Sequence, residues 1–455
     1  MPMGEAQRAD VVVVGMGVGG EEVAEQLAGA GLSVIGIEHT LVGGECPYWG
    51  CVPTKMMVRA GNALAEARRI PGLAGSSTVQ ADWAPVAKRI RDEATDSWDD
   101  KVAVDRFVGK GGIFVRGRAT ITGPGRVKVD EQEYVATRGL VIATGTAAVI
   151  PSVEGLADTP YWTNRDAVET ETLPETLLVL GGGAIGLEFS QVMARFGVQV
   201  TVIEGSDRLL SMEEPESSET AAAALARDGV KALTGVRARR VSHSDAGFSV
   251  ELSDGSTVTG EKLLVATGRT ARLGSLGLET IGLDPSARFL ATDERMRAAD
   301  KVWAVGDVTG HGNFTHMAVY EARIAIRDIL GEDGPAADYR ALPRVTFIDP
   351  EIGAVGMTEK QARDAGLDVQ VGYTPLSSSS RGWIHGPGNE GFIKLIVDGA
   401  RGVLVGATSA GPSGGEILGA LSVAVQAEVP IATLKSTIWA YPTFHRALDA
   451  ALSSV

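Results

Sequence analysis

Two glycine-rich turns, each between a short apolar run and an amphipathic segment, predict an α/β protein containing two Rossmann-like domains. The first turn follows Val11–Val14 and the second follows Leu177–Leu180. From about Pro343 strands come first and helices follow, without such a turn, which predicts a third, α+β domain. The second domain is expected to be inserted in the first. The predicted boundaries are 1–150 with 271–342, then 151–270, and last 343–455.

Length and composition agree with a multidomain globular protein and argue against nucleic-acid-binding and membrane-spanning proteins. The chain has 455 residues, 44% hydrophobic and 22% charged. Its net charge of −15 argues against a nucleic-acid partner, for which a basic stripe is expected. No apolar run approaches the roughly 20 residues of a membrane span. Met1–Asp10 lacks an apolar signal core, so we expect a cytoplasmic protein without membrane association.

The first glycine turn carries the pattern of a dinucleotide-binding loop. Its G-x-G-x-x-G motif stands at Gly15, Gly17 and Gly20. The first glycine permits the tight turn, the second lets a pyrophosphate approach the backbone, and the third allows close helix–strand packing. A helix over 21–30 and a strand over 33–37 are expected next, ending in Glu38. Glu38 lies 23 residues after Gly15, where it can bind a ribose hydroxyl pair.

The second glycine turn repeats the arrangement. Its motif stands at Gly181, Gly183 and Gly186. A strand over 199–203 is expected to end in Glu204, again 23 residues after the first glycine. An acid there favours a free ribose 2′-hydroxyl, and therefore NADH, because it repels a 2′-phosphate. Arg208, four residues on, leaves NADPH open.

Three further buried strands are expected to end in turns that contain glycine. Leu140–Gly145 ends in Thr144 and Gly145, and a similar Ala-Thr-Gly ending at Gly268 closes the second unit. The strand beginning at Val302 ends in Gly306 and Asp307, and we interpret it as a return to the first domain. Other expected elements are a largely solvent-facing helix over 85–108, short strands over 113–130, helices over 317–330, 414–427 and 443–452, and strands over 344–348 and 392–397.

The only two cysteines, Cys46 and Cys51, lie in a glycine-rich segment before a helix expected over 55–70. Four intervening residues span about one helical turn, so both sulfurs can meet on one face. Packing alone would not require this spacing, and in a reducing cytosol such a pair is typical of redox catalysis. The aromatic residues between them, Tyr48 and Trp49, could shape a pocket for a flat acceptor or simply pack.

Together, the two nucleotide motifs, the Gly-Gly-x-Cys-x4-Cys-x-Pro-x-Lys segment and the third domain resemble the flavoprotein disulfide reductases. That family includes lipoamide dehydrogenase, glutathione reductase and mercuric reductase. The resemblance implies FAD in the first site, NADH or NADPH in the second, and a homodimer formed by the third domain. The residues implied to bind the cofactors are Gly15, Gly17, Gly20, Glu38, Thr144, Gly145, Gly306 and Asp307, and Gly181, Gly183, Gly186, Glu204 and Gly268.

The resemblance also implies a relay of electrons from the nicotinamide through the flavin to the cysteines. Cys51 would be the thiolate against the flavin, and Cys46 the thiol that meets the acceptor. Lys55 and Glu188 match a family ion pair near flavin N5.

The carboxyl-terminal segment departs from the family pattern His-Pro-Thr-x-x-Glu. Tyr441 replaces the histidine and Arg446 replaces the glutamate. A phenol with a reference pKa near 10 is a poor proton shuttle at neutral pH, so the usual interchange loses its acid–base partner. His445, one helical turn from Tyr441, is either a displaced shuttle or a solvated helix residue.

We therefore predict an FAD-dependent NAD(P)H oxidoreductase that delivers electrons to a small-molecule acceptor other than a standard dithiol. A metal ion, a quinone and a specialised disulfide are the candidates. One alternative is lipoamide dehydrogenase with a displaced shuttle. Another is mercuric reductase, although the chain ends without a vicinal cysteine tail and has no amino-terminal cysteine-bearing metal domain. A binding subunit without turnover is the third.

Overall fold

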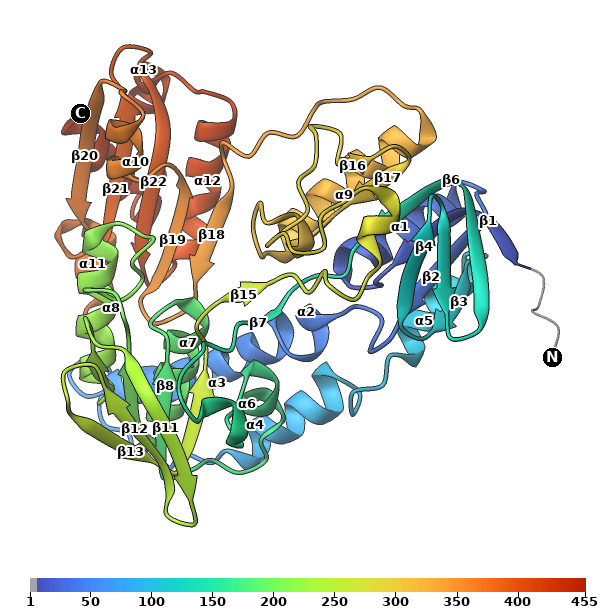
Figure 1. The fold of residues 1–455 in the computed structure, drawn as a ribbon. Coiled ribbons are helices and arrows are strands. Elements are labelled where there is room, and N and C mark those ends of the chain that lie inside the picture. Colours follow the sequence, from blue (N-terminus) through green and yellow to red (C-terminus); the bar gives the residue numbers. More distant parts are fainter. Residues whose placement is uncertain (1–5) are drawn as a thin grey trace. The chain divides into compact units, whose positions relative to one another are not determined.

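The computed structural model describes residues 6–455 and divides them into two compact units (Figure 1). The first contains residues up to 53, 88–149 and 268–338. The second contains 54–87, 150–267 and 339–455. Both mix helices and strands, in agreement with the predicted α/β class. The finer division into three domains stays a prediction.

The first unit is built on a mainly parallel sheet with strand order β16-β17-β6-β1-β2-β3, and β4 and β5 extend it. Its strands are β1 (Gln7–Val14), β2 (Val34–Glu38), β3 (Ile113–Arg116), β4 (Ala119–Gly123), β5 (Arg126–Val129), β6 (Gln132–Ile142), β16 (Arg297–Ala299) and β17 (Val302–Ala304). A separate ladder pairs β7 (Ala147–Ala148) with β15 (Arg269–Thr270). Strand β17 pairs in parallel with β6, which confirms the predicted return at Val302.

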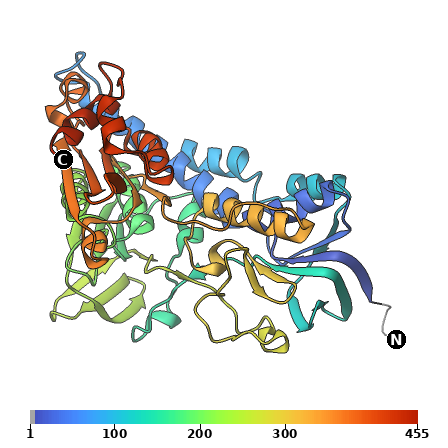
Figure 2. The same ribbon diagram turned by 90° about the horizontal axis from the view of Figure 1, so that it is seen from above.

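Helices of this unit are α1 (Val18–Gly29), α2 (Glu45–Tyr48), α5 (Lys101–Gly109) and α9 (Thr315–Leu330). Helices α1 and α9 lie side by side (Figure 2). Their close approach depends on Gly19, where an added Cβ would lie 3.3 Å from the side chains of Ala318 and Val305. Two further helices, α3 (Cys51–Arg69) and α4 (Ala84–Arg89), contain positions at which the chain passes from one unit to the other.

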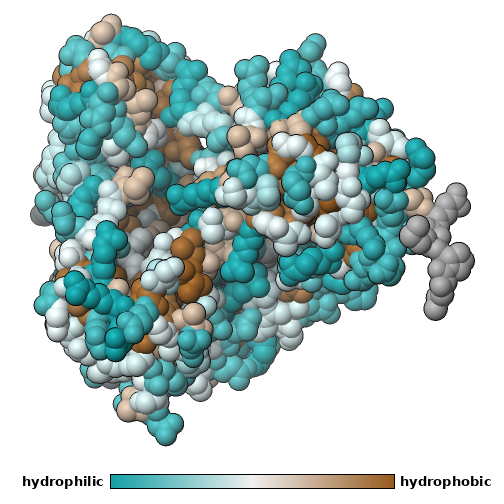
Figure 3. All heavy atoms as spheres, viewed as in Figure 1, coloured by the Kyte–Doolittle hydropathy of each residue, from teal (hydrophilic) through white to brown (hydrophobic). Residues whose placement is uncertain are grey.

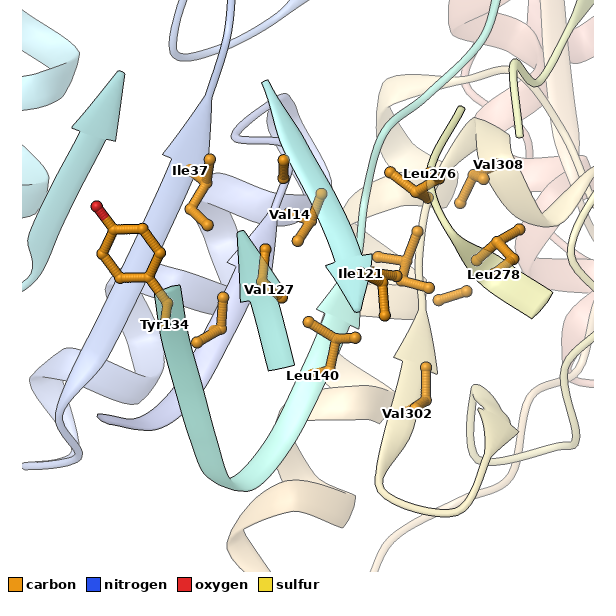
Figure 4. Close-up of a cluster of buried hydrophobic side chains, with 14 of the residues drawn as sticks. Val14, Ile37, Ile121, Val127, Tyr134, Leu140, Leu276, Leu278, Val302 and Val308 are labelled. Carbon is orange, nitrogen blue, oxygen red and sulfur yellow. The ribbon is translucent and has the colours of Figure 1, made fainter. Parts of the chain in front are cut away.

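One face of the first sheet carries a continuous hydrophobic cluster (Figure 4). Val14, Ile37 and Leu140 come from adjacent parallel strands, and Val302 from the returning β17. Each is at most 3% exposed, so each contributes on the order of 2 kcal/mol by burial. The cluster fixes the sheet whose strand ends carry the first glycine loop and Asp307.

The second unit contains a parallel sheet of order β10-β9-β8-β14, a three-stranded sheet β11-β12-β13, and an antiparallel sheet β18-β19-β22-β21-β20 (Figure 1). The strands are β8 (Thr176–Leu180), β9 (Gln199–Ile203), β10 (Lys231–Leu233), β11 (Ala238–Ser244), β12 (Gly247–Leu252), β13 (Thr257–Gly260), β14 (Lys262–Val265), β18 (Pro343–Thr346), β19 (Glu351–Gly356), β20 (Val369–Pro375), β21 (Phe392–Asp398) and β22 (Val403–Gly411). The helices are α6 (Asn164–Glu169), α7 (Ala184–Arg195), α8 (Pro215–Arg227), α10 (Glu359–Asp364), α11 (Ser380–His385), α12 (Gly414–Gln426), α13 (Ile431–Ser436) and α14 (Ala447–Ser453).

The predicted helix over 85–108 is wrong as a single element. Helix α4 continues into a π-helical turn, Ile90–Ala94, and the chain then breaks before α5. Asp96, Ser97 and Trp98 all have positive φ values of 48–59°, which a helix cannot contain. Its residues are also less solvent-facing than predicted, because Ile90 and Phe107 are at most 1% exposed.

The face of the molecule in Figure 3 is covered mainly by hydrophilic residues, with smaller hydrophobic patches between them. Among residues 6–455, no helix has the length and apolar character required to cross a membrane.

Candidate active site

The first glycine loop has the geometry of a pyrophosphate cradle. Gly15 has φ +90°, and a Cβ at Gly20 would lie 1.9 Å from the Gly15 carbonyl oxygen. A Cβ at Gly17, by contrast, would meet only the Gly44 Cα at 3.9 Å. Gly17 therefore faces open space, where the backbone can receive a ligand. Helix α1 begins at Val18 without a side-chain cap, so its first N–H groups provide donors for an anion.

Glu38 fixes this loop from the end of β2. Its carboxylate accepts hydrogen bonds from the backbone N–H groups of Met16 at 2.9 Å and Thr40 at 2.7 Å. Burial raises the pKa of Glu38, but hydrogen bonds from His39, Thr40 and Met16 outweigh it and lower the pKa to about 2. Glu38 is thus a buried, permanently charged acid directly beside the loop.

The second glycine loop repeats this arrangement around Glu204. A Cβ at Gly186 would lie 2.2 Å from the Gly181 carbonyl oxygen, whereas Gly183 faces open space. The Glu204 carboxylate accepts the N–H groups of Gly182 and Ser206, both at 2.6 Å. Helix α7 begins directly after Gly183 and also lacks a side-chain cap.

Arg208, which left NADPH open at the sequence level, is directed toward its own chain. Its guanidinium donates to the carbonyl oxygens of Ser211 at 2.8 Å and Glu213 at 2.7 Å, and to the Ser218 hydroxyl. A guanidinium engaged in this way is poorly placed to bind a 2′-phosphate.

Asp307 lies at the start of a short turn after β17. Its carboxylate accepts the Thr146 hydroxyl at 2.8 Å, and burial raises its pKa. Arg269 donates to the same hydroxyl at 2.9 Å and lies 3.9 Å from the Glu45 carboxylate. A chain of polar contacts therefore links Asp307 to the helix that carries Cys46. Sequence reasoning missed Arg269 and Thr146.

The neighbouring residues predicted to bind the cofactor also have defined surroundings. The Gly306 N–H donates a hydrogen bond of 2.7 Å to the carboxylate of Glu321, a residue that is 1% exposed. Thr144 is exposed and Gly145 has φ +64°. Gly268 has φ +115°, and its carbonyl accepts the Val149 N–H beside the β7–β15 ladder.

The cysteine segment packs directly on the first glycine loop. The Gly43 N–H donates to the Met16 carbonyl at 2.7 Å. Gly44 has φ +69°, and a Cβ there would lie 2.8 Å from the Gly17 Cα. Only glycine fits at this contact, so the Gly-Gly pair before Cys46 sets the distance between the thiols and the pyrophosphate cradle.

The two cysteines lie on separate helices, which corrects the prediction of a single helical face. Cys46 belongs to α2, and Cys51 is the first residue of α3, which begins four residues earlier than predicted. The pKa of Cys46 is raised above its usual range, first by a hydrogen bond with the Cys51 side chain and second by burial. The Cys51 sulfur lies 3.2 Å from the Thr315 hydroxyl. Cys51 stands at the start of a 19-residue helix, a position whose partial positive charge favours a thiolate.

The aromatic residues between the cysteines are packed inside the unit. Tyr48 and Trp49 are 6% and 7% exposed, which favours packing over an acceptor pocket. The Trp98 indole, in the segment between α4 and α5, donates to the Tyr48 carbonyl at 3.3 Å.

In the second unit, Lys55 and Glu188 form the predicted ion pair at 2.5 Å. The other Glu188 carboxylate oxygen accepts the Phe347 N–H at 2.8 Å, and the Lys55 ammonium lies 4.6 Å from the centre of the Phe347 ring. Phe347 is far away in sequence and carries no motif, so sequence reasoning missed it.

Tyr441 is 71% exposed and lines a groove in the third predicted domain. The groove has a volume of about 280 Å³. Its other lining residues are Thr374, Ser378, Ser379, Ser380, Arg381, Pro442, Thr443, Arg446, Ala447, Asp449 and Ala450. His445 is not among them. The expectation that Tyr441 and His445 lie one helical turn apart is wrong, because Tyr441 precedes the 3-10 turn Phe444–Arg446.

Family models match most of the chain. Residues 9–322 match the pyridine nucleotide-disulphide oxidoreductase model, and residues 342–452 match its dimerisation domain. The chain belongs to this family. It is therefore an oxidoreductase of an FAD-dependent family that uses NAD(P)H.

Relatives in this family are named for different substrates. The chain is 33% identical to dihydrolipoyl dehydrogenase of Chlorobaculum tepidum, covering 96% of this chain and 95% of the relative. It is 30% identical to mercuric reductase of Staphylococcus aureus, covering 97% and 81%. Among solved structures, HOCl-induced flavoprotein disulfide reductase RclA from Escherichia coli matches with a TM-score of 0.87 and 28% identity, covering 98% and 100%. A Cu(II) complex of RclA matches with a TM-score of 0.86 and 27% identity, covering 98% and 99%.

Proposed function

We propose that this oxidoreductase takes electrons from NADH, passes them through FAD to the Cys46–Cys51 pair, and delivers them to a small acceptor other than a standard dithiol. The observation that carries this proposal is the acceptor-side groove. Tyr441 and Arg446 line it where the family pattern has histidine and glutamate, and His445 does not.

The first unit is proposed to hold FAD. Its pyrophosphate would lie over Gly17, where a Cβ would otherwise point into open space, and at the uncapped start of α1. Glu38 and Asp307 would bind sugar hydroxyls. Bound FAD would accept two electrons from the nicotinamide and make them available to the disulfide. NAD(P)H would lie correspondingly over Gly183, with Glu204 favouring NADH.

The cysteines are proposed to alternate between disulfide and dithiol. Reduction breaks the Cys46–Cys51 S–S bond with two electrons and one proton, which leaves Cys46 as a thiol and Cys51 as a thiolate. A two-electron acceptor then takes those electrons, the Cys46 proton and a second proton from solvent, and the S–S bond forms again. Cys51 would hold the thiolate at the start of α3, and Cys46, with its raised pKa, would hold a proton until the acceptor arrives.

The third predicted domain is proposed to form a homodimer. Large apolar side chains are exposed on it, among them Ile438 at 97%, Trp383 at 79% and Val423 at 65%. Exposed residues of this kind mark interaction surfaces. In such a dimer Tyr441 of one subunit would serve the cysteines of the other.

A second candidate function is dihydrolipoyl dehydrogenase activity, which the 33% identity to an enzyme of that name favours. This candidate requires another group to replace the missing acid–base histidine. A third is reduction of a metal ion, favoured by the similarity to mercuric reductase and to RclA, which has been solved as a Cu(II) complex. Among residues 6–455, no cluster of three or more His, Cys, Asp or Glu side chains could hold a metal ion.

The relay is tested by mixing purified holoenzyme with NADH in a stopped-flow spectrometer. We expect flavin reduction followed by a long-wavelength thiolate–flavin band that Cys51→Ser abolishes. The matched variant Cys46→Ser should retain the band and lose acceptor turnover. If Cys51→Ser leaves the band unchanged, the proposed role of Cys51 is wrong.

The acceptor is tested by steady-state turnover with lipoamide, quinones and Cu(II), each with NADH and NADPH. We expect faster turnover with a quinone than with lipoamide, and Cu(II) turnover tests the metal-ion candidate. Rapid lipoamide turnover by the unmodified enzyme would contradict the proposal. A large gain in lipoamide turnover by Tyr441→His would support it, because that change restores the missing base.

A further inference from the structure

The groove beside Tyr441 has a charge that selects among acceptors. We propose that it is a binding site for the anionic group of a negatively charged two-electron acceptor, with Arg381 and Arg446 as its cationic residues. This inference rests on the proposed function, in which Tyr441 lies on the acceptor side of the enzyme.

The charged side chains of the groove are two arginines and one aspartate. Arg446 forms an ion pair with Asp449, three residues further on. Arg381 lies over the Phe444 ring, with its guanidinium carbon 5.6 Å from the ring centre. The ring contact uses the positive charge of Arg381 but none of its five N–H donors. The groove therefore has a net charge of +1, and Arg381 keeps donors that match a carboxylate or sulfonate.

Several hydroxyl groups of the groove are already committed to the backbone. Ser378 donates to the Pro375 carbonyl at 2.7 Å, and Ser379 donates to the Leu376 carbonyl at 2.6 Å. Thr443 donates to the Ala440 carbonyl at 2.7 Å. These bonds hold the walls of the groove in place, but their protons are used. Arg381 and Arg446 are the cationic donors that the groove offers an acceptor, beside the hydroxyl groups of Thr374, Ser380 and Tyr441.

This charge discriminates between the acceptor classes. A divalent metal cation is repelled by a groove of net positive charge, and a neutral quinone gains nothing from it. An anion gains a charge-assisted hydrogen bond that the other two cannot form. The family pattern has a glutamate where Arg446 stands, so that single replacement changes the local charge by +2.

The test compares two quinones that differ in charge. Turnover of NADH-reduced holoenzyme is measured with 1,4-naphthoquinone-2-sulfonate and with 1,4-naphthoquinone, for Arg381→Gln, Arg446→Gln and the double variant. Arg401→Gln is the matched control, because Arg401 is an exposed arginine that pairs with Glu428 and does not line the groove.

We expect each single variant to lower kcat/KM for the sulfonate about tenfold through KM, as expected for one charge-assisted hydrogen bond. Turnover of the neutral quinone should change less than about twofold, as should both activities of Arg401→Gln. The preference of the unmodified enzyme for the sulfonate should also weaken as salt is added. Equal losses with both quinones, or no loss with either, would overturn the inference.

Direct binding separates this inference from the proposed function. Oxidised holoenzyme is titrated calorimetrically with the naphthoquinone sulfonate, with FAD content and dimer mass verified for each variant. Binding to the unmodified enzyme that the double variant loses supports the anion site even if no quinone is turned over. Turnover of neutral quinones without measurable binding of the sulfonate would refute the anion site while leaving the proposed relay intact.

Discussion

The two glycine loops share a backbone plan but differ in how deeply their acids lie. Glu38 and Glu204 each accept two backbone N–H groups. One comes from the second residue of the glycine loop, and the other from the residue two positions after the acid itself. Glu38 is 6% exposed and has a pKa lowered to about 2, whereas Glu204 is partly exposed. The residue after the first glycine is the fully buried Met16 in one loop and Gly182 in the other.

This difference matches two different demands on a nucleotide site. An enclosed, permanently charged acid rigidifies a loop around a cofactor that stays bound, and it offers water little access. An acid at an accessible edge can bind a coenzyme that must leave after each turnover. The contrast predicts that equivalent substitutions in the two loops have different consequences.

The largest effect is expected from the third glycine of each motif. Gly20→Ala places a Cβ 1.9 Å from the Gly15 oxygen, and Gly186→Ala places one 2.2 Å from the Gly181 oxygen. Gly20→Ala should yield protein without FAD, whereas Gly186→Ala should retain FAD but lose its reduction by NADH. Flavin absorbance after purification and NADH-dependent bleaching measure the two outcomes.

Gly29→Ala is the control for these variants, because a Cβ at Gly29 meets nothing within 4 Å. It should behave as the unmodified enzyme. If Gly186→Ala loses FAD as completely as Gly20→Ala does, the two loops do not serve separate nucleotides.

The next effect concerns stability and pH. The pKa of Glu38 falls from 4.5 to about 2 on folding, so its stabilisation is complete above about pH 4.5 and is lost as the pH falls toward 2. A shift of this size corresponds to on the order of 3 kcal/mol. Urea unfolding should therefore show a loss of about that size for Glu38→Gln at pH 7, and a much smaller loss near pH 3. Glu204→Gln, at the more exposed acid, should cost less at pH 7. If Glu38→Gln lost as much unfolding free energy at pH 3 as at pH 7, this assignment would be contradicted.

Much of this comparison could be predicted from the sequence, because local rules determine it. A buried strand, a glycine turn and a helix are successive in the chain, so each acid could be placed at a strand end. The limits of β9, Gln199–Ile203, were predicted in full for the same reason. The return of the chain at Val302 followed from a third buried run after the second unit had closed.

The remaining features depend on contacts between residues that are distant in sequence. Phe347 reaches Glu188 through a backbone N–H, which any residue type could supply. The break between α2 and α3 also resists prediction. There a Cβ on Gly50 would lie only 3.0 Å from the Glu45 carbonyl oxygen. The sequence predicted a helix only from residue 55 onward, so it indicated neither α2 nor the start of α3 at Cys51. The groove at Tyr441 needs α11 and the last turn of the chain to be brought together.

A smaller effect is expected where the two helices after the loops differ. Glu22 and Glu188 each stand seven positions after the first glycine of their motif. Glu188 pairs with Lys55 at 2.5 Å, whereas Glu22 lies 4.0 Å from an exposed arginine, Arg323. We expect Glu188→Gln to slow flavin reduction by NADH about tenfold, because it removes the charge that orients Lys55. Glu22→Gln is the matched control and should leave the stopped-flow rate unchanged. Equal rates for the two variants would show that the Lys55–Glu188 pair does not act in this step.

The smallest effect should appear in coenzyme choice, through Glu204. In Glu204→Gln the carboxamide still has an oxygen to accept one N–H of the loop, so the fold should persist. The negative charge that repels a 2′-phosphate is lost, and with it a strong acceptor for the ribose hydroxyls. We expect KM for NADH to rise about fivefold and KM for NADPH to fall, each of the order of one weakened hydrogen bond. Steady-state rates with both coenzymes at saturating acceptor measure the change.

Glu38→Gln provides the contrast, because it should alter FAD retention without changing the ratio of the two KM values. Since Arg208 is engaged by its own chain, Arg208→Gln should not change that ratio either. A marked loss of NADPH use in Arg208→Gln would instead place a 2′-phosphate at this arginine and reverse the preference for NADH.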